Sequence, residues 1–361
     1  MLIVNIIAAI ALILSDLACV ISPVDFWFPA FFGLAHIPLL LINILFMFFW
    51  IFLLRKWVIV SFVVVVFSWG HIGTHFRFWK TENKTISADT LRIMSFNVRL
   101  FDLYQWKTEK KYKTRSRIFN MVGEQRPDLL CMQEYYSNKE KKFDVKDTLK
   151  RVDSLKYNFV ANFKTFSGEK EWGMAIYCKY PLFNKQRITF KNSLNNYFQY
   201  ADFCKGTDTM RIFNIHFESI HFGQEDYLFM NDLANSHTER QDPFAILKRI
   251  YSKLGVAFSR RAQQVELVKL YVSSSPYPVI LCGDFNDTPA SFVYNRIIEE
   301  LDDSFCESGS GLSSTYPNLF IPLRIDYILH SKKLFQSVHY DVIREDLSDH
   351  FPITSTLVRK R

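Results

Sequence analysis

The sequence predicts an α/β protein in which helices cover the sheets, preceded by a membrane unit. Residues 1–66 contain only four charged side chains: Asp16, Asp25, Arg55 and Lys56. From residue 91 onward, apolar strand-like runs alternate with helical stretches. Most of these runs end in polar residues, which indicates a site at one rim of a sheet. We therefore divide the chain into a membrane unit (1–78), a linker (79–90) and a soluble domain (91–361).

Three apolar runs support the membrane unit: residues 2–21, 26–54 and 57–76. Each can cross a hydrocarbon core of about 30 Å, which takes about 20 helical residues. The first run could instead be a signal peptide, but it lacks a basic n-region and a second apolar run follows at once. We predict three transmembrane helices. Asp16, inside the first, is expected to reach toward an interface or to face another helix; a proton relay is disfavoured because no partner is evident.

The few charges predict the orientation of these helices. The connection at residues 22–25 has no Lys or Arg, whereas the next connection contains Arg55 and Lys56. The positive-inside rule puts these two residues in the cytoplasm, so the third helix leads outward. We therefore expect an integral membrane protein, of the bacterial inner membrane, with its soluble domain outside the cytoplasm. The bilayer is the expected partner, and the sequence points to no protein partner.

Charge and cysteine content narrow the function classes. Five of 44 Lys and Arg and four of 36 Asp and Glu precede Thr90, which leaves 39 against 32, or +7, on the soluble part. This excess suits a polyanionic substrate or an anionic membrane surface, and nearly as well ordinary solubility. No Cys-x-x-Cys spacing occurs, and Cys131, Cys178 and Cys282 lie inside apolar runs. They are expected to be buried hydrophobes, not zinc ligands or a disulfide framework.

The soluble domain begins after a polar, aperiodic stretch at residues 81–90. Strands are predicted at 92–98, 128–133, 173–178, 210–216, 278–283, 325–329 and 353–358. Helices are predicted at 113–124, 244–254, 260–272 and 290–301.

The run at residues 279–286 is the most informative of these strand ends. Asp284 and Asn286 would share one face of the strand while Phe285 points into the core. Gly283 permits a bend or the close approach of another group. A strand that delivers polar groups to a cleft and a strand that ends in an Asx turn explain this pattern equally well.

Four further strand ends carry polar side chains. Asn97 could orient a ligand or cap a turn. Glu134 follows an apolar run, where a carboxylate is costly to bury without a cation or a donor, although it could also face solvent. Asn214 and His216 would share one strand face, and a lone histidine of this kind is more often structural. Asp326 starts an apolar strand, where a cap or a salt bridge to a neighbouring arginine is also adequate.

The last polar pair is Asp349 and His350, before the final strand. Adjacent strand residues face opposite ways, so both can reach one site only from a loop. His350 paired with Asp326 would be held in one tautomer and kept basic. Together these residues supply what hydrolysis of a phosphate ester needs: carboxylates for a metal, donors for phosphoryl oxygens and a base for water. No nucleophile elbow, Walker loop or zinc spacing competes.

In their order along the chain, these motifs resemble those of the DNase I-like endonuclease/exonuclease/phosphatase superfamily. Together with the predicted membrane unit, they resemble a membrane-anchored bacterial-type member of it. They are Ser95-Phe96-Asn97-Val98, Gln133-Glu134, Asn214-Ile215-His216, Gly283-Asp284-Phe285-Asn286, Ile325-Asp326-Tyr327 and Ser348-Asp349-His350. The resemblance implies a four-layer α/β sandwich with two antiparallel-to-mixed sheets between helical layers. It also implies Mg²⁺ or Mn²⁺, with Glu134 as principal metal ligand and Asn97 and Asp349 close to metal and phosphate.

The resemblance also implies roles in proton transfer. Asp284 and His350 would handle the attacking water and its protons, with Asp326 orienting His350. Which of Asp284 and His350 is the base stays open, since the protons can belong to the cluster as a whole. His216 and Asn286 would donate to phosphoryl oxygens as charge develops.

Substrate contacts are expected from Asn97, Arg99 and Asn214. Arg99 resembles an arginine that approaches phosphate in DNase-type members, and a surface arginine is the alternative. Tyr135 and Tyr136 stand where nucleolytic relatives often carry a basic residue, and they could stack on a base or sugar, or pack. The long segment 217–259 carries Phe222, Tyr227, Phe229 and Met230, which suggests a lid or membrane-facing wall.

These observations predict a membrane-anchored, metal-dependent phosphoesterase that hydrolyses phosphodiester or phosphomonoester bonds by metal-assisted attack of water. The substrate would be a nucleic acid, a phospholipid or a phosphorylated small molecule, and a lipid phosphodiesterase is the alternative to a nuclease. The competing class is a catalytically silent binding module on the same scaffold. Silence is disfavoured because a decayed site could lose these polar groups without harm to the core.

Overall fold

The computed structural model describes residues 1–79, 90–104, 113–138, 144–150, 155–166, 170–191, 196–220, 243–317 and 323–360. The chain forms two compact units. A helical unit comprises Met1–Ser68, Glu218–Glu266 and Ala290–Asn295, and a second unit comprises Trp69–Phe217, Leu267–Pro289 and Arg296–Arg361. These units follow packing, so their boundaries differ from those of the segments predicted from hydropathy. The predicted linker and the predicted lid at 222–230 fall mostly or wholly outside the described residues.

The N-terminal apolar runs form four helices: α1 (Leu2–Leu17), α2 (Phe28–Leu34), α3 (His36–Phe52) and α4 (Val58–His75). The second run is thus two helices with a 74° bend between them, because Ala35 leaves the helical conformation. By length and composition α4 could cross a membrane, and the bent pair could count as a second span, whereas α1 is a shorter apolar helix. Three spans therefore remain a prediction.

Polar side chains join these helices to one another. Ser68 Oγ of α4 donates to Asp16 Oδ2 of α1 at 2.5 Å, and His36 Nδ1 of α3 lies 3.7 Å from Asp16 Oδ1. Ser15 Oγ lies 2.8 Å from the same His36 nitrogen. Of the two places expected for Asp16, the structure gives the one that faces other helices. Its partner His36 could not be recognised from the sequence because the second run carries no formal charge.

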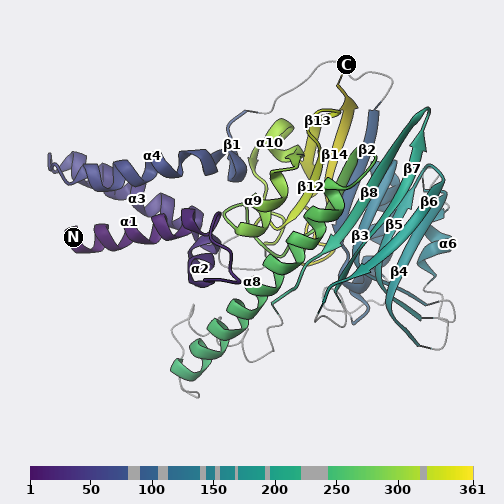
Figure 1. The fold of residues 1–361 in the computed structure, drawn as a ribbon, viewed down its shortest axis with the longest axis horizontal. Helices are drawn as coiled ribbons and strands as arrows, with labels where there is room; N and C mark the ends of the chain where they lie inside the picture. Colours follow the sequence, from purple (N-terminus) through teal and green to yellow (C-terminus); the bar gives the residue numbers. More distant parts are fainter. Residues whose placement is uncertain are drawn as a thin grey trace. The chain divides into compact units, whose positions relative to one another are not determined.

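The second unit is built on two six-stranded sheets (Figure 1). The first has the order β13 (Phe335–Val342), β14 (Ile353–Arg359), β2 (Thr90–Asn97), β3 (Leu129–Asn138), β5 (Lys170–Cys178) and β4 (Tyr157–Phe166). The second has the order β10 (Leu301–Asp303), β12 (Asp326–Ser331), β9 (Val279–Asp284), β8 (Asp208–His216), β7 (Tyr197–Lys205) and β6 (Leu182–Thr189). Pairs β2–β3 and β8–β9 are parallel and the others antiparallel, so both sheets are mixed, as predicted.

All seven predicted strands are present, shifted or extended by a few residues. Sequence patterns missed β4, β6, β7, β10, β13 and the short ribbon of β1 (Phe76–Arg77) and β11 (Gly311–Leu312). Several of these are edge strands or short strands, in which an apolar pattern is weak.

The helices complete the element order. They are α5 (Lys113–Gln125), α6 (Val145–Lys150), α8 (Pro243–Ser273), α9 (Phe292–Ile298), α10 (Ser304–Ser308) and the short turn η1 (Arg99–Asp102). The two helices predicted at 244–254 and 260–272 are one continuous helix, so that prediction was wrong. Gly255, which lies between the two predicted segments, packs against the ring of Trp27, where a Cβ would come to 3.0 Å.

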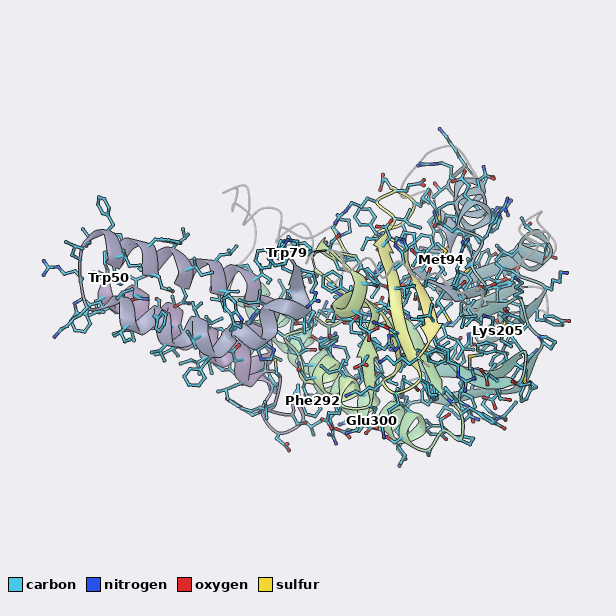
Figure 2. The ribbon with its side chains drawn as sticks, turned by 90° about the horizontal axis from the view of Figure 1, so that it is seen from above. Trp50, Trp79, Met94, Lys205, Phe292 and Glu300 are labelled. Atoms are coloured by element: carbon cyan, nitrogen blue, oxygen red, sulfur yellow. The ribbon has the colours of Figure 1, made fainter. Side chains whose placement is uncertain are left out.

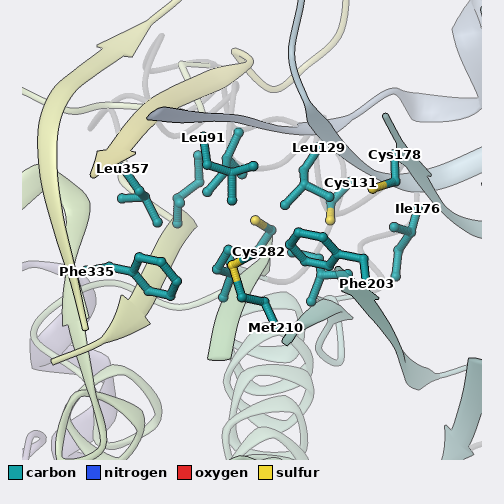
Figure 3. Packing of buried hydrophobic residues seen from close by; sticks show 14 of the residues in the cluster. Leu91, Leu129, Cys131, Ile176, Cys178, Phe203, Met210, Cys282, Phe335 and Leu357 are labelled. Carbon is teal, nitrogen blue, oxygen red and sulfur yellow. The ribbon is translucent and has the colours of Figure 1, made fainter. Parts of the chain in front are cut away.

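The core fills the space between the two sheets (Figure 3). Leu91 of β2 and Met210 of β8 lie in it with Cys131, Cys178 and Cys282, which are buried free thiols, as expected. On the outer face of the first sheet, Met94 and Phe96 pack with Ile118, Met121 and Val122 of α5. On the second sheet, Phe198 of β7 meets Tyr271 of α8 edge to face at 5.3 Å. Helices therefore cover both outer faces, as the sandwich prediction requires.

Candidate active site

Strand register brings three of the predicted site residues to one rim of the second sheet. Asp326 of β12 lies directly opposite Asp284 of β9, and His216 of β8 lies opposite Asp284 on the other side. In the first sheet, Asn97 ends β2 opposite Gln133 of β3. Each of these polar residues lies at one end of an apolar strand. The strands therefore bring them together at the rim while the core stays regular.

The turn after β9 explains why the chain reads Gly-Asp-Phe-Asn. A Cβ on Gly283 would collide with the Ile215 carbonyl oxygen of the neighbouring strand, so only glycine fits. Asn286 has φ 53°, and its N–H donates to Asp284 Oδ1 at 2.8 Å, which is an Asx-type turn. The turn and the delivery of polar groups, posed as alternatives, occur together.

Asp284 is the centre of the site and is 1% exposed. Asn97 Nδ2 donates to its Oδ2 at 3.0 Å. His216 Nε2 lies 3.6 Å and His350 Nε2 3.7 Å from the same oxygen. Burial raises the pKa of Asp284, and the nearby His350 and His216 oppose that rise. A buried carboxylate with a raised pKa among imidazoles is suited to accept a proton.

His350 and Asp326 form a close pair, as the sequence predicted. His350 Nδ1 lies 2.9 Å from Asp326 Oδ2. Burial lowers the pKa of His350, but the charges of Asp326 and Asp284 outweigh it and raise the pKa to about 10. The ring of Tyr316 covers His350 edge to face at 5.0 Å. At neutral pH the imidazole therefore carries a proton and presents Nε2–H toward Asp284.

Glu134 approaches the same point from the first sheet. It sits at an irregularity in the pairing of β3 and β5, with φ 49°. Asn97 Nδ2, which donates to Asp284, also donates to Glu134 Oε1 at 3.2 Å. His216 Nε2 lies 4.0 Å from that oxygen and makes no hydrogen bond to the described residues. Non-glycine residues with positive φ cost free energy and cluster at functional sites.

The loop after β2 supplies Arg99 and faces Asp349. Arg99 Nε lies 3.3 Å from Asp349 Oδ2. Arg99, Leu100, Phe101 and Asp102 all have φ between 42° and 57°, a left-handed turn that L-residues disfavour. Ser348 Oγ donates to the Asn97 carbonyl at 2.9 Å and so fixes the Asp349 loop against β2. Arg99 is therefore partly paired and not simply a surface arginine.

Two groups of residues fit a divalent cation. Glu134 and Asp284 converge on one amide nitrogen of Asn97, and two carboxylates this close favour a cation between them. In the arrangement described, the Asn97 oxygen instead accepts from the Arg99 N–H at 3.1 Å, so Asn97 could ligate a metal only with its amide reversed. Asp284, Asp326 and His350 form the second group, with ligand atoms within 4.8 Å of one another.

Two predicted site residues, the substrate contact Asn214 and the catalytic residue Asn286, make other contacts in the structure. Asn214 is fully buried: its oxygen accepts from Gln133 Nε2 at 2.7 Å and its nitrogen donates to the Met132 and Ala175 carbonyls at 3.0 Å. It thus ties the second sheet to the first instead of reaching a substrate. Asn286 Nδ2 donates to the Phe217 carbonyl at 3.1 Å, which directs part of its amide away from the rim.

The two tyrosines after Glu134 pack in the core, one of the two alternatives. Tyr135 is fully buried with its hydroxyl 3.0 Å from that of Tyr177, and Tyr136 packs against Trp172 at 4.9 Å. Sequence reasoning missed Thr315, whose hydroxyl accepts from the N–H groups of Ile325 and Asp326 at 3.1 and 3.2 Å. Thr315 lies in an irregular loop, where neither periodicity nor a motif marks it.

The chain belongs to the endonuclease/exonuclease/phosphatase family, whose model matches residues 94–350. The matched range contains every residue of the site described above. A second family, described only as a domain of unknown function, matches residues 1–75. No curated protein matches the chain.

Solved structures share the fold of the second unit. The catalytic domain of human nocturnin with a bound sulfate anion is 15% identical, with 75% of this chain and 95% of that chain covered and a TM-score of 0.52. A family protein from Bacteroides thetaiotaomicron is 20% identical, with 75% and 98% covered and a TM-score of 0.53. One from Leptotrichia buccalis is 16% identical, with 75% and 100% covered and a TM-score of 0.50. At these identities the likeness establishes the fold alone.

Proposed function

We propose that the protein is a membrane-anchored phosphoesterase that hydrolyses phosphate ester bonds by attack of water on phosphorus. The observation that carries this proposal is the Asp284 carboxylate, 1% exposed yet surrounded by Asn97, His216 and His350. Such a group is costly to keep in a core unless it serves chemistry.

The protonation states support one choice of acid and base. Asp284 accepts the proton of the attacking water, because burial raises the pKa of its carboxyl. His350 stays protonated and donates from Nε2 to the phosphoryl or leaving oxygen, while Asp326 holds its ring through Nδ1. His216 Nε2, without a hydrogen bond to the described residues, donates to a phosphoryl oxygen as charge develops.

Glu134 would hold a divalent cation, with Asn97 and Asp284 beside it. A bound Mg²⁺ or Mn²⁺ would stabilise the charge on the phosphoryl group. We favour this oxygen-rich set over Asp284, Asp326 and His350 because the nitrogen Nδ1 of His350 already bonds Asp326 and Mg²⁺ prefers oxygen ligands. Arg99, beside Asp349, would contact the substrate phosphate.

Anchoring rests on α4 and on the apolar surface of the N-terminal helices. Ile59, Phe62, Phe67 and Trp69 of α4 are exposed, as a bilayer would require. With Arg55 and Lys56 in the cytoplasm, α4 leads outward. The second unit, which contains the candidate active site and is called the catalytic unit below, then lies outside the cytoplasm. Protease added to intact cells should therefore cut the catalytic unit, and protection of that unit would contradict this placement.

Hydrolysis of bis(4-nitrophenyl) phosphate by the full chain in detergent tests the catalytic proposal. We expect Mg²⁺-dependent release of nitrophenol that EDTA abolishes and that Glu134→Ala and His350→Ala each remove. Asp208→Asn is the matched control, because Asp208 begins the strand that His216 ends and makes only an exposed ion pair with Arg359. A silent binding module would show no hydrolysis in any variant, and activity unchanged in both alanine variants would refute the assignment.

A further inference from the structure

The last two turns of α4 are part of the catalytic unit. The segment Trp69–Phe217 belongs to that unit, and β1, which follows α4 directly, pairs with β11 through Phe76 opposite Leu312. Figure 1 shows β1 at the end of α4 and next to α10. The Sγ of Cys306 in α10 lies 3.8 Å from the Gly73 carbonyl. The helix that could cross a membrane therefore ends on the catalytic fold and not on a free linker.

Arg324 connects the C-terminal end of α4 to the catalytic unit, and we call this contact and the neighbouring ribbon of β1 and β11 the joint. Its Nη1 donates to the Thr74 carbonyl at 2.8 Å, which is one of the carbonyls that a helix leaves unpaired at its C-terminus. Its Nη2 bonds Asp303 Oδ2 at 2.5 Å, and its guanidinium lies 4.5 and 4.7 Å from the rings of Phe305 and Tyr327. Arg324 is 5% exposed, so the contact is a buried, rigid clamp.

The clamp lies beside the catalytic rim. Arg324 precedes Asp326 by two residues, and two residues of chain span at most about 7 Å. One arginine side chain covers the remaining distance to Thr74. Asp326 bonds His350, so the end of α4 reaches the same rim of the sheet as the catalytic pair.

The surface at this joint suits the headgroup layer of a bilayer. Phe78 and Trp79 are 69% and 81% exposed and form an aromatic pair, and Leu312 across the ribbon is also exposed. Trp79 is labelled in Figure 2. Aromatic rings next to an apolar helix are typical of a membrane interface.

We infer that the catalytic rim is held at the bilayer surface and that its substrate is a phosphate ester carried in the headgroup layer of the membrane. This inference rests on the proposed function and on anchoring through α4. It narrows the substrate class, because the C-terminal end of α4 is bonded to Arg324, two residues before Asp326 of the catalytic pair. A lipid headgroup then reaches the rim as a neighbour, whereas a nucleic acid must diffuse to it.

Two probes with the same reacting group distinguish a substrate carried in the membrane from a substrate in solution. The full chain in phosphatidylcholine vesicles is assayed on hexadecyl 4-nitrophenyl phosphate within the vesicles and on ethyl 4-nitrophenyl phosphate in solution. We expect kcat/KM for the embedded probe to exceed that for the soluble probe by about tenfold or more, from the higher local concentration. Leu312→Glu should remove this preference and keep the rate on the soluble probe.

The outcomes are distinguishable. Equal rates on both probes, or a preference that survives Leu312→Glu, would overturn the inference and leave the proposed function intact. No Mg²⁺-dependent hydrolysis of either probe would refute the proposed function, and the inference falls with it.

A second measurement locates the joint without any turnover. A fluorophore on Leu312→Cys, in a chain with Cys204→Ser and Cys306→Ser, should be quenched by spin-labelled lipid. The same label on Phe183→Cys, an exposed position in edge strand β6, serves as the control and should be quenched less. Equal quenching at both positions would contradict a bilayer-docked joint.

Discussion

Two clusters of acid and histidine in this molecule have nearly the same composition and different designs. In the helical unit, Asp16 and His36 meet Ser68 and Ser15, and every contact joins one helix to another. At the catalytic rim, Asp326 and His350 are closer, at 2.9 Å. There Asn97, His216 and His350 also converge on one oxygen of a further carboxylate, that of Asp284.

The difference shows that an acid–histidine pair does not by itself define an active site. The helical cluster uses its polar atoms to fix helix packing, which stabilises an apolar unit at modest free energy per bond. The rim instead gathers three carboxylates and two histidines at one place, a set that can bind a substrate and a cation. Substitutions at the catalytic rim should therefore lower activity, and substitutions among the helices should lower stability. The expected effects on activity decrease from the first substitution to the last.

Asp284→Asn should have the largest effect. The amide cannot accept the proton of water, so kcat should fall by about 10²–10⁴-fold, the range for loss of a general base. KM and the thermal unfolding temperature should change little, since the amide can keep the Asn97 contact. A kcat within twofold of wild type would show that another group is the base.

Glu134→Gln should weaken the metal next. Loss of a carboxylate ligand should raise the Mn²⁺ dissociation constant by about 10–100-fold or more, since even supporting residues contribute that much. Electron paramagnetic resonance of Mn²⁺ titrated into the full chain measures this directly. If Asp326→Asn weakened Mn²⁺ and Glu134→Gln did not, the group of Asp284, Asp326 and His350 would be the metal site instead.

Asp326→Asn should lower kcat through His350. The variant removes the charge that holds the imidazole and that raises its pKa, so His350 should lose its proton at lower pH. We expect about a 10²-fold loss of kcat at neutral pH, within the range for a lost acid–base partner. A pH–rate profile that kept the shape of the wild type would argue that Asp326 is structural only.

Asn214→Ala should affect stability more than chemistry. It removes one of the two hydrogen bonds of Gln133 Nε2, which also donates to Ser95 Oγ at 3.3 Å, and the side-chain bonds to the Met132 and Ala175 carbonyls. Each group left unsatisfied costs about 1–3 kcal/mol. Unfolding of the catalytic unit by urea should shift accordingly, while KM stays near that of wild type. A large rise in KM with unchanged stability would restore the predicted substrate contact.

Asn43→Leu should have the smallest effect on activity. Asn43 Oδ1 accepts from Ser61 of α4 at 3.2 Å and its nitrogen donates to Ala8 of α1, so the change removes bonds between helices. Within apolar surroundings each is worth about 0.6–1.7 kcal/mol. Detergent-induced unfolding of the helices should come earlier, with hydrolysis of bis(4-nitrophenyl) phosphate unchanged. A loss of activity would show that the contacts between the N-terminal helices contribute to catalysis.

The polar residues of the catalytic rim could be predicted because each of them interrupts an apolar run in the sequence. An apolar strand that stops on Asp284, Glu134 or His216 stands out in any window of the sequence. The edge strands β4 and β6 were missed because solvent covers one side of them and their apolar pattern is weak. Helix α8 was divided wrongly: it is continuous, and Gly255, between the two predicted segments, packs against Trp27 within it.

Partners that depend on tertiary contacts left no trace in the sequence. His36 looks like one neutral residue in an apolar run, and only helix packing brings it to Asp16. Thr315 and the Arg324 clamp on Thr74 depend on residues far apart in the chain. Asn214 was assigned to the substrate because its position on the strand is the same whether the neighbouring face is a cleft or the first sheet.

Hydrolysis of bis(4-nitrophenyl) phosphate in water enriched in ¹⁸O tests the central claim most directly. Attack of water on phosphorus predicts one ¹⁸O atom in each molecule of 4-nitrophenyl phosphate formed with Mg²⁺ by the full chain, none in the nitrophenol, and no product from Asp284→Asn above background. Mass spectrometry reads both products from one reaction. Label in the nitrophenol, or equal labelled product from Asp284→Asn, would contradict water attack at phosphorus by this site.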